Sequence, residues 1–144
     1  TFGGNKLTEV GLQVLRTLPR LQSLNLSGKQ RTDSGLWTVG TTDLGLDPVA
    51  SVTELRTLNL SGLGISGRGL ARLQPLEKLE RLDVHGCQRV GDEAVEALAG
   101  MSALKWVDVR DTGFTAAGIA ELNRRRPELR VAGAPEAAAA PSVR

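Results

Sequence analysis

The chain has 144 residues, of which 40% are hydrophobic and 24% charged, and its 18 basic and 16 acidic residues leave a formal net charge of +2. This size and composition fit one soluble globular unit and exclude a multidomain enzyme. No apolar run approaches the roughly 18 residues that would span a bilayer, so we expect no membrane span. Leucine accounts for 23 residues, against two Phe, two Trp and no Tyr, which predicts an aliphatic core built by repetition.

One phrase of the form LxxLxL recurs along the chain. Its apolar positions are Leu21-Leu24-Leu26, Leu55-Leu58-Leu60, Leu79-Leu82-Val84 and Leu104-Val107-Val109, with a fragment at Leu129-Val131. Successive copies start 34, 24, 25 and 25 residues apart. Apolar and polar residues alternate within the phrase, which is the period of a strand with one buried face.

A second phrase follows each strand segment: LTEVGLQVL from Leu7, RTDSGLWTV from Arg31, ISGRGLARL from Ile65, VGDEAVEAL from Val90 and FTAAGIAEL from Phe114. Thr or Ser stands at a plausible N-cap (Thr8, Thr32, Ser66, Thr115), and apolar residues such as Leu12, Leu15 and Leu18 follow at helical spacing. Each unit is therefore predicted to be strand, turn and helix, with successive strands parallel. Because Asn25, Asn59, Asp83 and Asp108 share one internal strand position, one sheet face must stay open, as in a solenoid with concave strands and convex helices.

The period is broken at three places. About ten extra residues between Val39 and Val49 are expected to interrupt the helix and to bulge from the convex or C-terminal side. Phe2 occupies the last apolar place of a strand whose beginning is absent, so the first repeat is predicted to be truncated. We predict a repeat domain over residues 1–131, in which Leu129 to Val131 add a short edge strand, and a disordered tail over 132–144.

These phrases resemble the leucine-rich repeat over roughly residues 2 to 131. The period of 24 to 25 residues and the xTDxGL-like helix start are similar to the cysteine-containing subtype found in F-box substrate receptors. In that subtype the ninth position is Asn or Cys, whose side chain bonds the turn backbone. Here this column reads Asn5, Lys29, Leu63, Cys87 and Thr112, so two of five positions fit. The resemblance implies an α/β leucine-rich repeat solenoid, or horseshoe, of about five repeats, and substrate recognition in a ubiquitin ligase.

Three motifs have structural explanations that we prefer to functional ones. Residues 62–67 form a literal GxGxxG, but the short crossover and the polar strand face favour tight turns over nucleotide binding. The single cysteine, Cys87, excludes a disulfide framework, points to a reducing compartment, and is expected to be an inert buried thiol. The cluster Arg124-Arg125-Arg126 ends a helix without interleaved aromatic residues, so we do not expect nucleic-acid binding.

The open strand face supplies the candidate binding residues. The first two repeats present small neutral side chains there, whereas the last two present Arg81, Asp83, His85, Trp106, Asp108 and Arg110. Tryptophan and arginine are enriched among interface hot spots, so we expect this half to contact a protein partner with Trp106 as anchor. Asp83 and His85 share a face and are expected to pair, while Arg81 or Arg110 offsets the neighbouring carboxylates of Asp83 and Asp108.

The sequence thus predicts a protein-protein interaction module and no enzyme, with no cofactor, metal or small-molecule substrate. The specific form that the resemblance implies is substrate recognition in a ubiquitin ligase complex, in the cytoplasm or nucleus. The alternative is a scaffold or assembly subunit of a larger complex. An organelle location would suit that alternative, because Met101 is the only methionine and a leader or an upstream segment is expected before Thr1.

Overall fold

The computed structural model describes residues 11–27, 29–32, 35–38 and 43–133. Several predictions lie outside these residues: the truncated strand ending at Phe2, the N-cap at Thr8, the ninth-position Asn5 and the tail beyond Gly133. No helix within the described ranges is long and apolar enough to cross a membrane.

A parallel sheet of five short strands runs through the whole described chain. The strands stack in the order β1 (Ser23–Asn25), β4 (Thr57–Asn59), β5 (Arg81–Asp83), β6 (Trp106–Asp108) and β7 (Arg130–Ala132). Each strand pairs with the next repeat in the register that the repeated phrase predicts, so that Leu58 lies opposite both Leu24 and Leu82. The predicted edge strand is confirmed as β7, which ends one residue beyond the predicted domain boundary.

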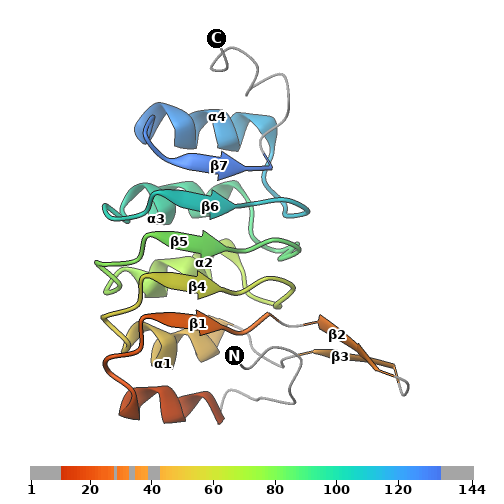
Figure 1. Cartoon of the computed structure of the whole chain (residues 1–144). Coiled ribbons are helices and arrows are strands. Elements are labelled where there is room, and N and C mark those ends of the chain that lie inside the picture. The colour runs from red at the N-terminus through yellow and green to blue at the C-terminus, as the bar shows by residue number, and fades with distance from the viewer. Residues whose placement is uncertain (1–10, 28, 33–34, 39–42, 134–144) are drawn as a thin grey trace.

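Helical segments cover one face of this sheet, as Figure 1 shows. They are η1 (Gly11–Thr17), η2 (Asp43–Gly45) with α1 (Leu46–Ala50), α2 (Gly67–Leu70) with η3 (Ala71–Leu73), η4 (Asp92–Ala94) with α3 (Val95–Ala99), and α4 (Ala116–Arg125). Their apolar residues form two buried columns, Leu46, Leu70, Val95, Ile119 and Val49, Leu73, Leu98, Leu122. Leu12 and Leu15 are also buried, whereas Leu18, expected on the same apolar face, is exposed. The predicted α/β solenoid with an aliphatic core is confirmed.

Two of the predicted N-caps are confirmed, and each is also bonded to the preceding repeat. The hydroxyl oxygens of Ser66 and Thr115 accept the N–H groups of the residues three positions later, at 3.4 and 3.2 Å. The backbone N–H and hydroxyl of Ser66 both donate to the Asp43 carboxylate, and those of Thr115 donate in the same way to Asp92. The helix starts therefore connect neighbouring repeats as well as satisfying their own backbone.

The insertion differs from its prediction. The segment from Arg31, expected to be a helix capped by Thr32, forms part of an antiparallel hairpin, β2 (Lys29–Thr32) and β3 (Gly35–Thr38). The helix of this unit is η2 and α1 instead, where Leu46 packs in the same column as Leu70 of the next repeat. The extra residues thus precede the helix rather than interrupt it. Figure 1 shows the hairpin extending beyond the carboxyl end of β1, the C-terminal side on which a bulge was expected.

The turns after the strands explain the glycine motif. Gly62 and Gly86 have φ angles of +74° and +76°, and Asp111 takes the same place in the next repeat with φ of +54°. Glycine adopts this left-handed region without steric cost. Gly67 leaves room for the Glu93 side chain, which a Cβ at position 67 would approach to 2.7 Å. Gly62 therefore serves a tight turn, as predicted, whereas Gly67 serves close packing, which was not predicted.

Candidate partner-binding face

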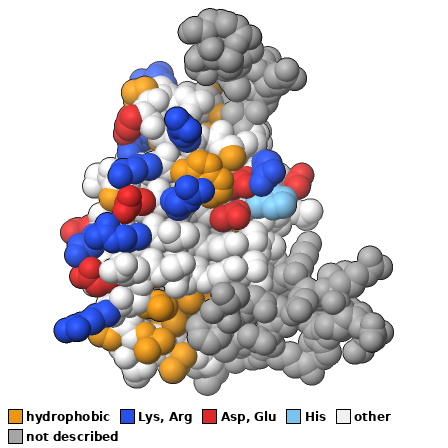
Figure 2. Space-filling view, in the orientation of Figure 1, with side chains coloured by type: hydrophobic (Ala, Val, Ile, Leu, Met, Phe, Trp, Pro, Cys, Tyr) orange, Lys and Arg blue, Asp and Glu red, His pale blue; other side chains and the backbone are white. Residues whose placement is uncertain are grey.

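We call the side of the sheet away from the helices the open face. It carries the first strand column, Ser23, Thr57, Arg81, Trp106 and Arg130, and the column two residues later, Asn25, Asn59, Asp83, Asp108 and Ala132. Between these columns Leu24, Leu58, Leu82 and Val107 are buried, as the alternation of a half-buried strand requires, and Val131 on the edge strand is partly buried. Figure 2 shows charged side chains gathered over β5 to β7, whereas the surface over β4 is largely uncharged. The change of polarity predicted along the array is therefore present.

Trp106 lies between two arginines on the open face. The strand register sets it opposite Arg81 on β5 and Arg130 on β7. The guanidinium carbon of Arg81 is 4.6 Å from the centroid of the Trp106 ring, a cation–π distance. Both arginines are exposed and Trp106 is partly exposed. The tryptophan therefore stands on the open face, with Arg81 covering part of its ring.

A groove of about 730 Å³ surrounds this tryptophan at the amino ends of the strands. Its lining residues are Arg56, Thr57, Glu80, Arg81, Lys105, Trp106, Glu128 and Arg130. Glu80 forms ion pairs with Arg56 at 3.0 Å and Lys105 at 3.1 Å. The hydrogen bond from Arg56, followed by that from Lys105, lowers the pKa of Glu80. At the amino ends of the strands, Arg56, Glu80 and Lys105 of three successive repeats thus form a row of paired charges along the groove.

The carboxyl ends of the strands carry the other predicted contact residues. The His85 ring lies 3.0 Å from Asp111, Nε2 to Oδ2, and the Asp83 carboxylate instead accepts the backbone N–H of His85 at 2.9 Å. The expected pairing of the His85 ring with Asp83 is therefore wrong. The cause is the turn, because Asp83 closes it by bonding the backbone two residues later, as Asn59 does in the preceding repeat.

Asp108 differs from the expectation of an open position, because it is 1% exposed. Arg110 accounts for this: its Nε lies 3.0 Å from both carboxylate oxygens, and its backbone N–H also donates to Oδ1 at 3.0 Å. Burial alone raises the pKa of Asp108, but the Arg110 hydrogen bonds and charge outweigh burial, so the pKa lies below its usual value. The register that sets Asp83 beside Asp108 is confirmed, and Arg110 is the cation that offsets the pair.

The basic cluster at the end of α4 is engaged within the chain. Arg124 and Arg125 both pair with Glu121, at 2.6 and 2.7 Å. Hydrogen bonds from Arg124 first, and then from Arg125, lower the pKa of Glu121 to about 2. Arg126 turns inward, is 11% exposed, and pairs with Glu128. These contacts support the structural explanation for the cluster, and nothing in the sequence period indicated the inward turn of Arg126.

The ninth repeat position is polar inside the stack in two repeats. Cys87 is fully buried and its Sγ donates to the Leu60 carbonyl at 3.0 Å, so the prediction of a buried thiol is confirmed. Thr112 occupies the equivalent place in the next repeat, and its hydroxyl donates to the Val109 carbonyl at 2.6 Å. Threonine here bonds the backbone of its own repeat, whereas Cys87 bonds that of the preceding repeat, and the Asn-or-Cys pattern did not reveal this threonine bond.

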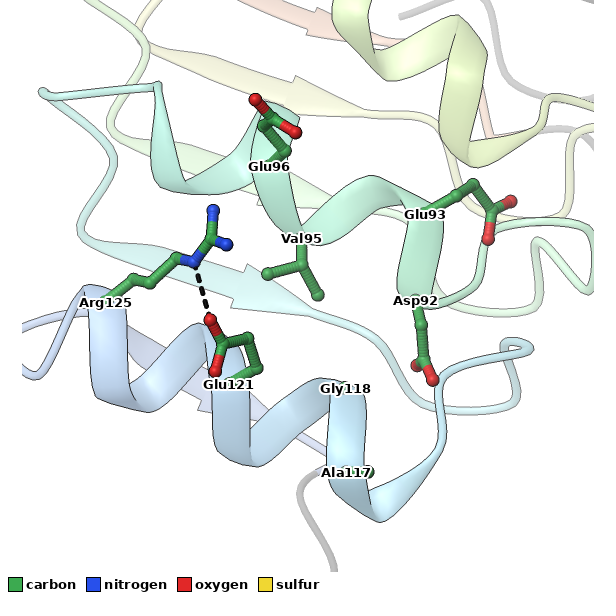
Figure 3. A pocket seen from close by; sticks show the side chains of 8 residues that line it. All are labelled: Asp92, Glu93, Val95, Glu96, Ala117, Gly118, Glu121 and Arg125. Atoms are coloured by element: carbon green, nitrogen blue, oxygen red, sulfur yellow. Dashed lines mark hydrogen bonds and ion pairs between the residues drawn. The ribbon is translucent and has the colours of Figure 1, made fainter.

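The helical side also has hollows, but they repeat with the period. One of about 380 Å³ lies between α3 and α4 and is drawn in Figure 3. Its lining residues are Asp92, Glu93, Val95, Glu96, Ala117, Gly118, Glu121 and Arg125, with Arg125 paired to Glu121. A hollow one repeat earlier involves Gly67, Ala71 and Gly100. Small residues between neighbouring helices produce both, so neither is distinctive. Across the described part of the chain, no group of three or more His, Cys, Asp or Glu side chains could hold a metal ion.

One family model agrees with the repeat over part of the chain. Residues 76–99 match the family model described as Leucine Rich repeat. No curated protein matches the chain. Among solved structures, the chain is similar to an internalin from Listeria monocytogenes, with 18% sequence identity and a TM-score of 0.48. The similarity covers 83% of this chain and 36% of the internalin chain, so this chain spans little more than a third of that protein.

The matched segment contains β5, η4 and α3, and the same succession of strand, turn and helix recurs on both sides of it. The open face, the buried leucine columns and the bonded turns are repeated with it. Residues 76–99 therefore carry a leucine-rich repeat, and the described chain is an α/β solenoid in which the same strand, turn and helix recur.

Proposed function

We propose that the protein binds a partner protein through the half of the open face over β5 to β7, with Trp106 as the anchor. The observation that carries this proposal is the partly exposed Trp106 ring between two exposed arginines. Val107 fills the core on the opposite side of the same strand, so the core gains nothing from the tryptophan. Tryptophan and arginine dominate the binding energy of many interfaces.

The contact set differs in two respects from the six residues that the sequence predicts. Asp108 is buried and holds Arg110, so it is proposed as a positioning residue rather than a contact. Arg130 is added because it flanks Trp106 from β7. The proposed contacts are therefore Arg81, Asp83, His85, Trp106, Arg110 and Arg130.

Affinity copurification with quantitative mass spectrometry tests the proposal. The chain is compared with Trp106→Ala and with Leu44→Ala, which removes an exposed apolar side chain from the helical side. Circular dichroism and urea unfolding check that each variant folds. We expect at least one direct partner to be lost with Trp106→Ala and retained with Leu44→Ala. If no bound protein depends on Trp106 in a folded variant, the proposal is wrong.

Substrate recognition in a ubiquitin ligase is the specific form that we propose for this binding. Its support is Cys87, whose bond to the turn backbone is the feature expected of the cysteine-containing repeat. The same copurification distinguishes it from the scaffold alternative. A ligase adaptor together with a Trp106-dependent client favours the receptor. Partners that persist in Trp106→Ala and all belong to one stable complex favour the scaffold. The absence of enzymatic activity and the intracellular location remain predictions.

A further inference from the structure

The groove around Trp106 has an unbalanced charge. Four of its lining residues are cationic, Arg56, Arg81, Lys105 and Arg130, and two are acidic, Glu80 and Glu128. Both acidic side chains already form ion pairs, because Glu80 pairs with Arg56 and Lys105, and Glu128 pairs with Arg126, which is not among the lining residues. Within the described ranges, Arg81 and Arg130 form no ion pair with a carboxylate. Two positive charges at this groove are therefore left for a ligand.

The two unpaired arginines stand on either side of the aromatic ring. Arg81, Trp106 and Arg130 occupy the same register position on three adjacent strands. Neighbouring strands lie about 4.8 Å apart, so the two arginine Cα atoms are separated by about 10 Å with the indole between them. An apolar contact flanked by two cations is thus presented as one unit. The equivalent positions in the first two repeats, Ser23 and Thr57, carry no charge.

We propose that this groove binds a partner segment in which an apolar side chain is flanked by acidic ones. The inference rests on the proposed function and specifies its partner. The apolar side chain packs on Trp106, and the carboxylates accept hydrogen bonds from the guanidinium groups of Arg81 and Arg130. Arginine is suited to this role because its planar donors bind a carboxylate in two-point contacts. The cation–π contact of Arg81 with the ring holds that guanidinium close to the surface before binding.

Single-stranded nucleic acid is the other polymer that aromatic and basic residues bind, and the groove suits it less. The Arg81 guanidinium lies over the Trp106 ring, so a base would lack a whole aromatic face to stack on, whereas a smaller apolar side chain needs only the exposed part of the ring. With only two uncompensated cations, few counterions would be released on binding. These observations favour an acidic peptide.

A displayed library of random dodecapeptides, selected on the immobilised chain, tests the inference without a known partner. Selected peptides are then measured by fluorescence polarisation against wild type, Trp106→Ala and Arg81→Gln/Arg130→Gln. The matched control is Arg16→Gln/Arg68→Gln, which changes the net charge equally at two exposed arginines of helical segments. A fluorescein-labelled oligothymidylate of about 16 nucleotides, a length that one binding site can cover, is measured in parallel.

We expect the selected peptides to carry acidic residues beside an apolar one. Their affinity should fall about tenfold or more in both Trp106→Ala and the double arginine variant, and stay within about twofold in the control, as for a central interface contact. Raising the salt from about 0.05 M to about 0.5 M should weaken binding to wild type more than to the double arginine variant, because the ionic part is screened.

Other results overturn the inference in distinguishable ways. Peptides that depend on Trp106 but show no acidic excess, or that bind the double arginine variant as well as wild type, refute the acidic partner and leave the proposed function intact. Tighter binding of the oligothymidylate that is lost in the double arginine variant identifies nucleic acid as the ligand instead. If no selected peptide depends on Trp106, the acidic inference is wrong, and the copurification experiment decides the proposed function separately.

Discussion

Replacement of Arg126 by alanine is expected to destabilise the C-terminal repeat strongly. This arginine follows α4, and its guanidinium lies against the turn that precedes β6. It donates to the Met101 carbonyl at 2.7 Å and to the Leu104 carbonyl at 2.9 Å. Longer contacts reach the carbonyls of Ala99 and Ser102, at 3.5 and 3.4 Å. One side chain thus bonds several backbone carbonyls of the preceding repeat, among them that of Met101, which also accepts the Leu104 N–H at 3.0 Å.

The size of the effect follows from these bonds. A hydrogen bond to a charged group contributes about 1.5–3 kcal/mol to the free energy of unfolding. Because the turn lies near the surface and water can replace part of the lost donor, we take the lower figure for the two short bonds, about 3 kcal/mol in total. Arg126→Lys should lose about half of this, since a single ammonium cannot reproduce the planar fork. The free energy of unfolding of an ordinary domain is about 5–15 kcal/mol, so a loss of about 3 kcal/mol is a large fraction of that stability.

Urea unfolding followed by circular dichroism measures the change, with Arg124→Ala as the matched control. Arg124 belongs to the same basic cluster but is exposed and, among the residues that the structure describes, pairs with Glu121 alone, so its removal should leave the unfolding midpoint nearly unchanged. Hydrogen exchange should also show faster exchange at Val109 N–H, which donates to the Ala132 carbonyl at the edge of the sheet. If Arg126→Ala shifts the midpoint no more than Arg124→Ala does, the capping role assigned to Arg126 is refuted.

Three further predictions concern a helix start, a turn and pH. Gly118→Ala should destabilise the chain, because the added Cβ would lie 1.9 Å from Asp92 Oδ1. In an Asp92→Ala background the same change should be neutral or stabilising by up to about 1 kcal/mol, since alanine favours helix over glycine. Urea unfolding of wild type, both single variants and the double variant measures this, and additive effects would contradict the contact. Gly86→Ala should cost about 1 kcal/mol because its φ of +76° strains any side chain, and an unchanged thermal midpoint would contradict it. The pKa of Asp108 is lowered in the folded chain, so the stabilisation that its carboxylate gives is complete above the ordinary aspartate pKa of about 4 and is lost as the pH falls through the lowered value. The free energy of unfolding of Asp108→Asn should therefore depend less on pH in that range than that of wild type. An identical dependence would mean that the bond to Arg110 adds nothing.

The repeat and its register could be predicted from the sequence because they depend on where apolar side chains fall. Leu58, Leu82 and Val107 stand at a spacing that only stacked parallel strands bury together, and the structure places them in one column. The helix starts at Ser66 and Thr115 were equally predictable, because an N-cap acts on backbone within three residues.

The hairpin at residues 29–38 could not be predicted in the same way. In the phrase from Arg31, Thr32 is followed three residues later by Gly-Leu, as Ser66 is in a true helix start, so local pattern favours a helix there. The segment that does become helical contains Gly45 and Pro48, which have weak helix propensity. Packing decided the outcome, because Leu46 fits the buried column of the neighbouring helices.

On the candidate partner-binding face, too, the sequence predicts the backbone positions but not the side-chain contacts. By itself the sequence determined which strand positions lie on the open face, and so placed Trp106 and Arg81 there. Only the tertiary structure decided how the side chains are used: the His85 ring meets Asp111, 26 residues away, and Arg126 reaches Met101, 25 residues away. The physical reason is the solenoid itself. Apolar spacing along the chain sets the backbone position of each residue, but the polar partners of side chains such as His85 and Arg126 stand in the neighbouring repeat, about one period away in sequence.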